Sequence, residues 1–213
     1  MVVSGYGGQL LIVLGAVGAA LAQSGGSFEQ QKRQGLDYLR NGQFDKAAAR
    51  LEEVWEQQQP PDAMVAEHLA IAYLNGDERK QQRNLAERAL ELMEKAIAGG
   101  GQATFLVNHS HERIGLVQGS NWTKFCRGRL SIRPGQLSFV SEAGERAGED
   151  SFDTDAAGLK EIQRNTQSDR GVFQIKAADT GGKQRTYNMV PRSWSAADSQ
   201  AIVFLAEKHL LKK

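Results

Sequence analysis

The tetrapeptides Leu39-Arg40-Asn41-Gly42 and Tyr73-Leu74-Asn75-Gly76 share their Asn-Gly pair and lie 34 residues apart. Asn-Gly is a strong turn signal, so each copy marks the end of an element. Apolar residues recur at spacings of three and four after the first copy and before the second, which predicts amphipathic helices. These stripes consist of Phe44, Ala47, Ala48, Leu51, Val54 and Trp55, and of Met64, Val65, Leu69, Ala72 and Tyr73. A helix pair repeated every 34 residues therefore decides the fold of residues 28–98.

The pattern in this region resembles the tetratricopeptide (TPR) family, in which small residues let paired helices approach closely and a proline follows the second helix. The matching positions are Gly35, Tyr38, Gly42-Gln43-Phe44, Ala47-Ala48, Leu51 and Pro60. In TPR arrays the first helix of each pair lines a concave groove. The resemblance thus implies a protein- or peptide-binding groove with five candidate contact residues, Gln34, Tyr38, Asn41, His68 and Asn75.

The second repeat is longer than the first. Ala48 and Leu51 match Ala89 and Leu92 at an offset of 41 residues, so about seven residues have been added. The charged stretch 77–83 is the expected place, as a longer loop or an extended helix start. Because two repeats cannot bury their own flanks, we expect the last helix, 85–98, to pack against another part of the chain.

The first 27 residues have a different character. Residues 10–22 form an uncharged run of 13 residues, too short to span about 30 Å of hydrocarbon, and Ala20-Leu21-Ala22 fits a signal-peptidase site. We therefore expect a signal peptide over 1–22 and a linker over 23–27. The combination resembles exported bacterial proteins and predicts a periplasmic or secreted protein. An uncleaved N-terminal anchor is the alternative, since the run has no preceding Lys or Arg.

A glycine-rich linker over 99–102 ends the helical region, and from Ala103 onward β-branched and aromatic residues alternate with polar ones. We expect about seven short strands and then a helix capped by Ser195, with an apolar stripe of Ile202, Leu205, Ala206, His209 and Leu210. The whole chain is therefore predicted to be α+β. The strands are expected at 103–111, 123–133, 137–140, 151–154, 159–162, 171–177 and 184–190, with a hairpin turn at 179–182.

This order of elements resembles pleckstrin-homology-like (PH-like) domains, including the GRAM type. The segments that carry the resemblance are 126–132, 137–140, Phe152 and 159–162. It implies that residues 103–213 form a bent barrel closed by the C-terminal helix. In family members that bind phosphoinositides, basic residues near the first hairpin grip phosphates, which makes Arg113, Lys124, Arg127 and Arg129 candidates for anionic lipid binding.

Charge separates the two halves. The chain has a net charge of +1, so no global field favours nucleic acid, which is not an expected partner. Residues 23–102 carry 10 basic and 13 acidic residues, whereas residues 103–213 carry 16 and 12. These opposite net charges favour intramolecular docking of the two halves.

One set of residues could carry metal chemistry. His109 and His111 lie two residues apart on an expected strand, so they share a face, and Cys126 on the next strand is a possible third ligand. The alternative is that both histidines are hydrogen-bonded at a strand end and Cys126 is a small core residue. As the single cysteine, Cys126 excludes an intramolecular disulfide.

The sequence contains no nucleophile elbow, phosphate loop, paired-carboxylate motif or dinucleotide fingerprint. We therefore expect no cofactor and a non-enzymatic protein of the cell envelope that binds a protein or peptide partner. An enzyme or metal-binding protein using His109, His111 and Cys126 is one alternative. Anionic lipid binding through the basic strand face, with a membrane surface as partner, is the other.

Overall fold

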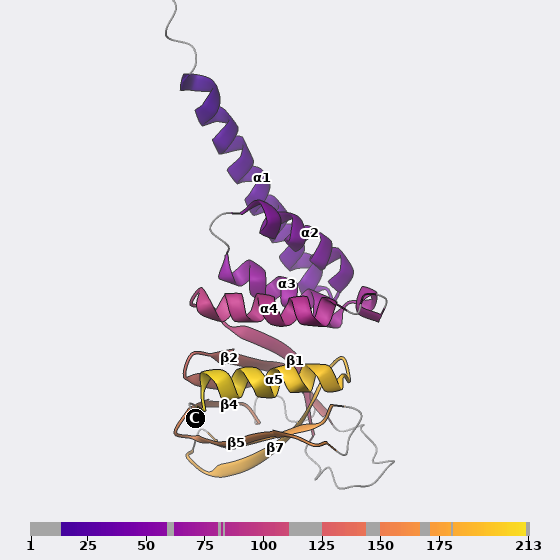
Figure 1. Cartoon of the computed structure of the whole chain (residues 1–213), viewed down its shortest axis with the longest axis vertical. Helices are drawn as coiled ribbons and strands as arrows, with labels where there is room; N and C mark the ends of the chain where they lie inside the picture. The colour runs from indigo at the N-terminus through magenta and orange to yellow at the C-terminus, as the bar shows by residue number, and fades with distance from the viewer. Residues whose placement is uncertain are drawn as a thin grey trace, which may run out of the picture.

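The computed structural model describes residues 14–58, 62–80, 82, 84–110, 125–143, 150–166, 171–179 and 181–211. The chain is α+β, as predicted (Figure 1). The helical half contains α1 (Leu14–Arg40), α2 (Phe44–Gln57), α3 (Ala63–Asn75), the short 3-10 helix η1 (Asp77–Lys80) and α4 (Leu85–Ala98). The strand half contains β1 (Ala103–Ser110), β2 (Phe125–Arg133), β3 (Gln136–Ala143), β4 (Phe152–Asp155), β5 (Leu159–Arg164), β6 (Phe173–Ala178), β7 (Gln184–Pro191) and α5 (Ala196–His209).

The four long helices of the first half form two hairpins, α1–α2 and α3–α4, with α2 also packed on α3. The predicted stripe of α2 is buried at Ala47, Ala48, Leu51 and Val54. Gly35 of α1 lies directly against this stripe, because a Cβ atom there would be 2.8 Å from Cγ of Leu51. A glycine thus allows the close helix approach that the sequence pattern indicated.

Residues 23–27, expected as an N-terminal linker, are helical. They belong to helix α1, which runs from Leu14 to Arg40 without a break. Each glycine in a helix costs about 1 kcal/mol relative to alanine, which weakens a helix but does not by itself end one. Residues 1–13 of the predicted signal peptide and Pro60 lie outside the described residues. Across the part of the chain that the structure describes, no helix has both the length and the apolar character needed to cross a bilayer.

The charged stretch 77–83 lies between α3 and α4. Within 77–83 the structure describes η1 and Gln82, and α4 begins at Leu85. The side chain of Asp45 in α2 accepts hydrogen bonds from the backbone nitrogens of Asp77 (3.2 Å) and Glu78 (3.3 Å). Carboxylates satisfy exposed N–H groups at a helix start in this way, so Asp45 fixes η1 to the first repeat.

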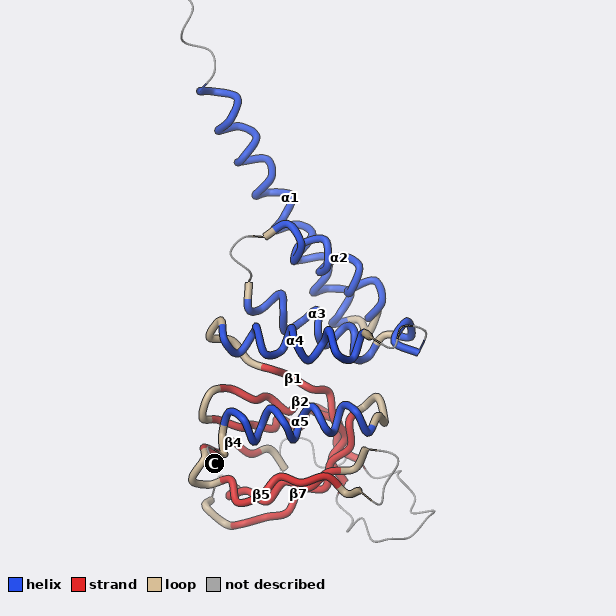
Figure 2. The backbone as a smooth tube through the Cα atoms, viewed as in Figure 1, coloured by secondary structure: helices blue, strands red, loops and turns tan. Residues whose placement is uncertain are grey.

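All seven strands form one antiparallel sheet in the order β4-β3-β2-β1-β7-β6-β5. The sheet curls until β4 contacts β6, and α5 lies across it, against β5, β2 and β7 (Figure 2). On β2, burial alternates along the strand, with Cys126, Gly128, Leu130 and Ile132 inside and Arg127, Arg129 and Arg133 outside, as predicted. The predicted 179–182 turn closes through a hydrogen bond from Gly182 N to Asp179 O (2.8 Å).

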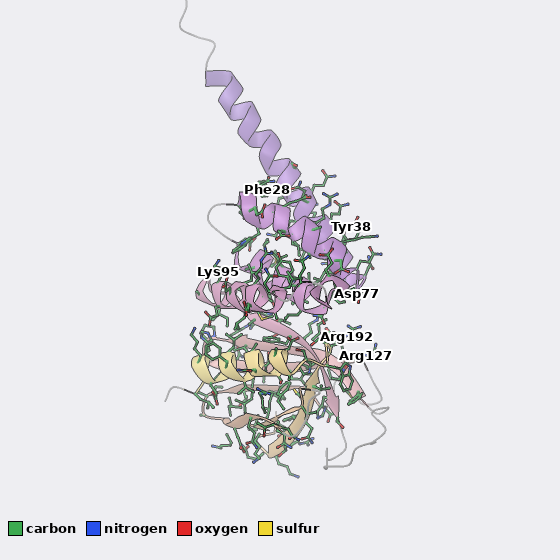
Figure 3. All side chains as sticks on the ribbon, turned by 45° about the vertical axis from the view of Figure 1, so that its right-hand side comes forward. Phe28, Tyr38, Asp77, Lys95, Arg127 and Arg192 are labelled. Atoms are coloured by element: carbon green, nitrogen blue, oxygen red, sulfur yellow. The ribbon has the colours of Figure 1, made fainter. Side chains whose placement is uncertain are left out.

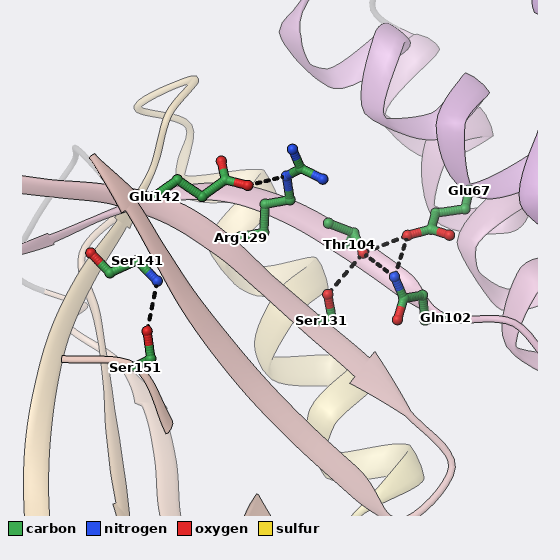
Figure 4. Close-up of polar contacts among 8 residues, drawn as sticks. All are labelled: Glu67, Gln102, Thr104, Arg129, Ser131, Ser141, Glu142 and Ser151. Atoms are coloured by element: carbon green, nitrogen blue, oxygen red, sulfur yellow. Dashed lines mark hydrogen bonds and ion pairs between the residues drawn. The ribbon is translucent and has the colours of Figure 1, made fainter. Parts of the chain in front are cut away.

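The two halves meet at β1. Both α3 and α4 contact this strand, so it covers the flank of the α3–α4 hairpin (Figure 1). Glu67 of α3 is only 7% exposed, and its Oε1 accepts hydrogen bonds from Thr104 Oγ1 (2.5 Å) and from Gln102 Nε2 (2.9 Å) (Figure 4). A second contact joins Lys208 of α5 to Glu94 of α4 at 2.7 Å. Polar and apolar contacts therefore both connect the halves.

Candidate binding groove between the two halves

An open groove of about 480 Å³ lies beside this junction and takes its walls from both halves. Its size falls within the range of sites that hold small ligands or short peptide segments. We call the side of the groove formed by the helical half the helical wall and the side formed by the strand half the strand wall. The helical wall consists of Phe44, Leu74, Asn75, Gly76 and Asp77, and the strand wall consists of Arg192, Ser193 and Ser195.

The helical wall offers mainly hydrogen-bond acceptors. Asn75 Nδ2 donates to the carbonyl of Ile71 (2.8 Å), which leaves its Oδ1 as the acceptor. Asp77 adds a carboxylate to this wall. A Cβ atom on Gly76 would lie 2.2 Å from Oδ1 of Asp45, so a larger residue between Asn75 and Asp77 would displace this carboxylate. The apolar side chains of Phe44 and Leu74 form the rest of this wall.

The strand wall is the turn between β7 and α5. Arg192 N donates to the carbonyl of Leu106 on β1 (2.9 Å), and Ser193 Oγ donates to Oδ2 of the buried Asp198 (2.5 Å). These bonds hold Trp194 at a φ of 56°, in the left-handed region, although its N–H still reaches the carbonyl of Pro191 (2.8 Å). A non-glycine residue in this region is strained, and such strain is often found at binding sites.

The arginines of β2 lie on the same outward face of the sheet as this turn. Arg127 pairs with Asn108 of β1, and Arg129 pairs with Leu106, whose carbonyl binds Arg192. Figure 3 shows Asp77, Arg192 and Arg127 on one flank of the molecule, at the level where the halves meet. Arg113 and Lys124, the other two lipid-binding candidates, lie outside the described residues.

The arginines differ in their ion pairs. Arg129 is bound to Glu142 at 2.7 Å, and Arg133 donates to Gln102 Oε1 at 2.7 Å (Figure 4 shows the Arg129 contact). No ion pair within the described part of the chain involves Arg127 or Arg192. Positive charge is therefore available at these two positions.

Of the five predicted groove residues, Asn75 lines this groove. Gln34 Nε2 donates to the hydroxyl of Tyr38 (3.2 Å) on the surface of α1, and Asn41 is exposed in the turn after α1. His68 Nδ1 lies 2.7 Å from the carbonyl of Met64 in its own helix. These four are placed on the helical half alone, away from the strand wall.

Two of the three predicted metal ligands, His109 and Cys126, point into the curled sheet. His109 lies directly opposite Cys126 in the β1–β2 register, and both are buried. The His109 ring packs at 5.8 Å from that of Phe139 and at 5.5 Å from that of Tyr187, whose pKa is raised by burial. His111 lies outside the described residues.

Sequence reasoning missed Asp150, whose Oδ2 lies 4.0 Å from Sγ of Cys126. Nothing in the spacing could have indicated this, because Asp150 follows β3 and reaches Cys126 through the curl of the sheet. Among the residues with described positions, no three His, Cys, Asp or Glu side chains are arranged to hold a metal ion.

No protein-family model and no curated protein matches the chain. Among solved structures, the C-terminal domain of an unknown protein from Leishmania infantum is similar at 18% identity and a TM-score of 0.32, over 59% of this chain and 98% of that one. Two structures titled as Vav1, one with an allosteric inhibitor and one an apo activated truncation, are each 8% identical, with TM-scores of 0.33 and 0.29. They match 85% and 84% of this chain, which spans 42% and 61% of theirs. Similarities this low assign neither a family nor an activity.

Proposed function

We propose that this protein is a non-enzymatic binding protein that holds an extended segment of a partner protein or peptide in the groove between its two halves. The observation that carries the proposal is the complementary chemistry of the walls, with the amide oxygen of Asn75 as an acceptor on one side and the guanidinium of Arg192 as a donor on the other. An extended peptide offers both N–H and C=O groups along its length, so it can satisfy both walls at once.

We further infer that the halves are a TPR-type helix pair and a PH-like domain. The close contact of Gly35 with Leu51 supports the first, and the strand order with a C-terminal helix across the sheet supports the second. Both domain types serve as binding scaffolds, which agrees with a non-enzymatic role. An exported location in the cell envelope remains part of the proposal on the sequence of residues 1–22.

The test is selection of peptides from a random twelve-residue display library on the full chain, followed by affinity measurement with two matched variants. Asn75 and Asn41 occupy equivalent places in the two repeats, but only Asn75 lines the groove. We expect Asn75→Ala to weaken binding about fivefold, since a lost hydrogen bond is worth about 1 kcal/mol, and Asn41→Ala to have no effect. If only Asn41→Ala weakened binding, the peptide would lie in the concave groove of the helical repeats instead. If no peptides were selected, the proposal would be refuted.

A further inference from the structure

We infer that the segment bound in this groove is acidic, with carboxylates paired to Arg127 and Arg192 and an apolar side chain on Trp194. The inference rests on the proposed function and specifies the chemistry of the partner. The residues involved belong to the strand half alone, and we call them the Arg127–Trp194–Arg192 surface. Arg192 lines the groove, whereas Arg127 and Trp194 lie outside its lining.

The register of the sheet places the two arginines close enough to contact one short segment. Arg127 is on β2, Arg192 follows β7, and β1 lies between these strands. Arg127 lies two strand spacings from Val190 and Arg192 is two residues further along, so the two arginines are roughly 12 Å apart, which is the length of three or four residues of extended chain. Acidic residues three or four positions apart in a bound segment could therefore reach both guanidinium groups.

The ion pairs of the neighbouring residues make these two arginines distinct. Arg129 lies on the same face but is neutralised by Glu142 at 2.7 Å. Arg127 and Arg192 are exposed and form no ion pair with any residue that the structure describes. Arginine binds carboxylates through two parallel hydrogen bonds, so a carboxylate is the group that best complements an arginine in this state.

Trp194 supplies an apolar contact beside Arg192. Its indole is 38% exposed and touches the ring of Phe125 edge-on at a centroid distance of 5.9 Å. The surrounding hydrogen bonds hold this residue at a φ of 56°, where a glycine would be unstrained. An exposed tryptophan next to arginine is the composition typical of the residues that contribute most to protein binding.

The helical wall sets the orientation of the segment. Asp77 repels a carboxylate, so acidic groups must face the strand wall while backbone N–H groups face the amide oxygen of Asn75. A flat bilayer can contact the exposed arginines but cannot also enter the groove to contact Asn75, whereas an extended peptide can do both. The arrangement therefore favours an acidic peptide over an anionic membrane.

The test repeats the library selection on the full chain and on an Arg127→Gln, Arg192→Gln double variant. We expect an excess of Asp and Glu in the peptides selected by the wild-type protein and none in those selected by the variant. Each single substitution should weaken the binding of a selected acidic peptide about fivefold to thirtyfold. Arg185→Gln is the control and should not weaken it, because this arginine of β7 already pairs with Asp179. Raising the salt concentration should weaken the wild-type complex and not that of the double variant.

Trp194→Gly separates binding from folding. Because glycine adopts a positive φ without strain, we expect the variant to keep its thermal midpoint within a few degrees, yet to bind the selected peptide about tenfold more weakly. If the variant bound more weakly only because less of the protein was folded, its thermal midpoint would fall. That result would contradict a direct contact between Trp194 and the peptide.

Three outcomes would overturn the inference. Selected peptides that bind through Asn75 but lack excess Asp and Glu would refute it and leave the proposed function standing. No selected peptides at all would refute both. Arginine-dependent binding to phosphatidylserine vesicles that an acidic peptide does not displace would assign the surface to a membrane.

Discussion

Gly128 has no room for a side chain. It lies inside the curled sheet at a register shift between β2 and β3, where a Cβ atom would stand 2.2 Å from the carbonyl oxygen of Val140 and 2.6 Å from Cε2 of Phe139. The nearer clash is with backbone, so side-chain rotation cannot relieve it. We expect Gly128→Ala to reduce the free energy of unfolding by at least 1–3 kcal/mol, the usual cost of overpacking a core, as measured by urea denaturation.

Gly181 provides the matched control for Gly128. It is exposed in the turn before β7, and a Cβ atom there would meet only Oδ1 of Asp179, at 3.3 Å. Gly181→Ala should change stability by less than about 0.5 kcal/mol. If both variants were equally stable, the close approach of the β3 backbone to Gly128 of β2 would be contradicted.

The start of α3 depends on a charged pair from α1. Asp62 caps the helix by accepting a hydrogen bond from Met64 N (2.8 Å), and its carboxylate also binds Lys32 Nζ (2.5 Å). Burial alone would raise the pKa of Asp62, but the bonds from Lys32 and Met64 outweigh it and lower the pKa. Its stabilising effect is therefore complete above the pKa of the unfolded chain, about 3.9, and is lost as the pH falls through the lower folded value.

Substitution at Asp62 separates the cap from the charge. Asp62→Ala should cost about 0.5–2 kcal/mol at pH 7, because the cap is lost. Asp62→Asn keeps a capping oxygen but removes the charge, so it should cost less and should weaken the decline in stability below pH 4. Urea denaturation between pH 7 and pH 3 measures both effects. A wild-type protein whose stability falls no more steeply than that of Asp62→Asn would contradict the lowered pKa.

Local sequence signals predicted the helices and strands well, because the apolar stripe of a helix and the alternation of a strand depend only on residues that are close in sequence. β7 was expected at 184–190 and runs from Gln184 to Pro191. Residues 23–27 were expected as a linker because of their glycines, but they lie within the helix α1. The groove between the halves was not predicted, although Asn75, which lines it, was a candidate contact in the groove expected within the helical repeats. Arg192 and Asp77 are 115 positions apart, and only the docking of the two halves brings them to one site.

Across the whole molecule, Glu67 connects the halves through a chain of hydrogen bonds. Thr104 also contacts Ser131 Oγ at 3.0 Å, and Gln102 accepts from Arg133 Nε, so the positive charge of Arg133 is linked indirectly to the buried carboxylate. Glu67→Ala would leave the Thr104 hydroxyl and the Gln102 amide without this acceptor. We expect a loss of about 1–3 kcal/mol and faster proteolysis within residues 99–102.

Glu91→Ala is the control for this prediction, because Glu91 is an exposed residue of α4. It should leave both stability and the rate of cleavage unchanged. If the wild-type chain were cut rapidly at Gly99–Gly101 into two pieces that separate freely, stable docking of the halves would be refuted.

The central position of β1 also affects the order in which the chain can fold during synthesis. The α3–α4 hairpin and β1 emerge one after the other, but β7, the second partner of β1, begins only at Gln184. At about 5–20 residues per second the ribosome reaches β7 roughly 4–15 s after β1. Until then β1 exposes an unpaired strand edge, which promotes aggregation. Nascent chains that stop before Gln184 should therefore depend on a chaperone to stay soluble.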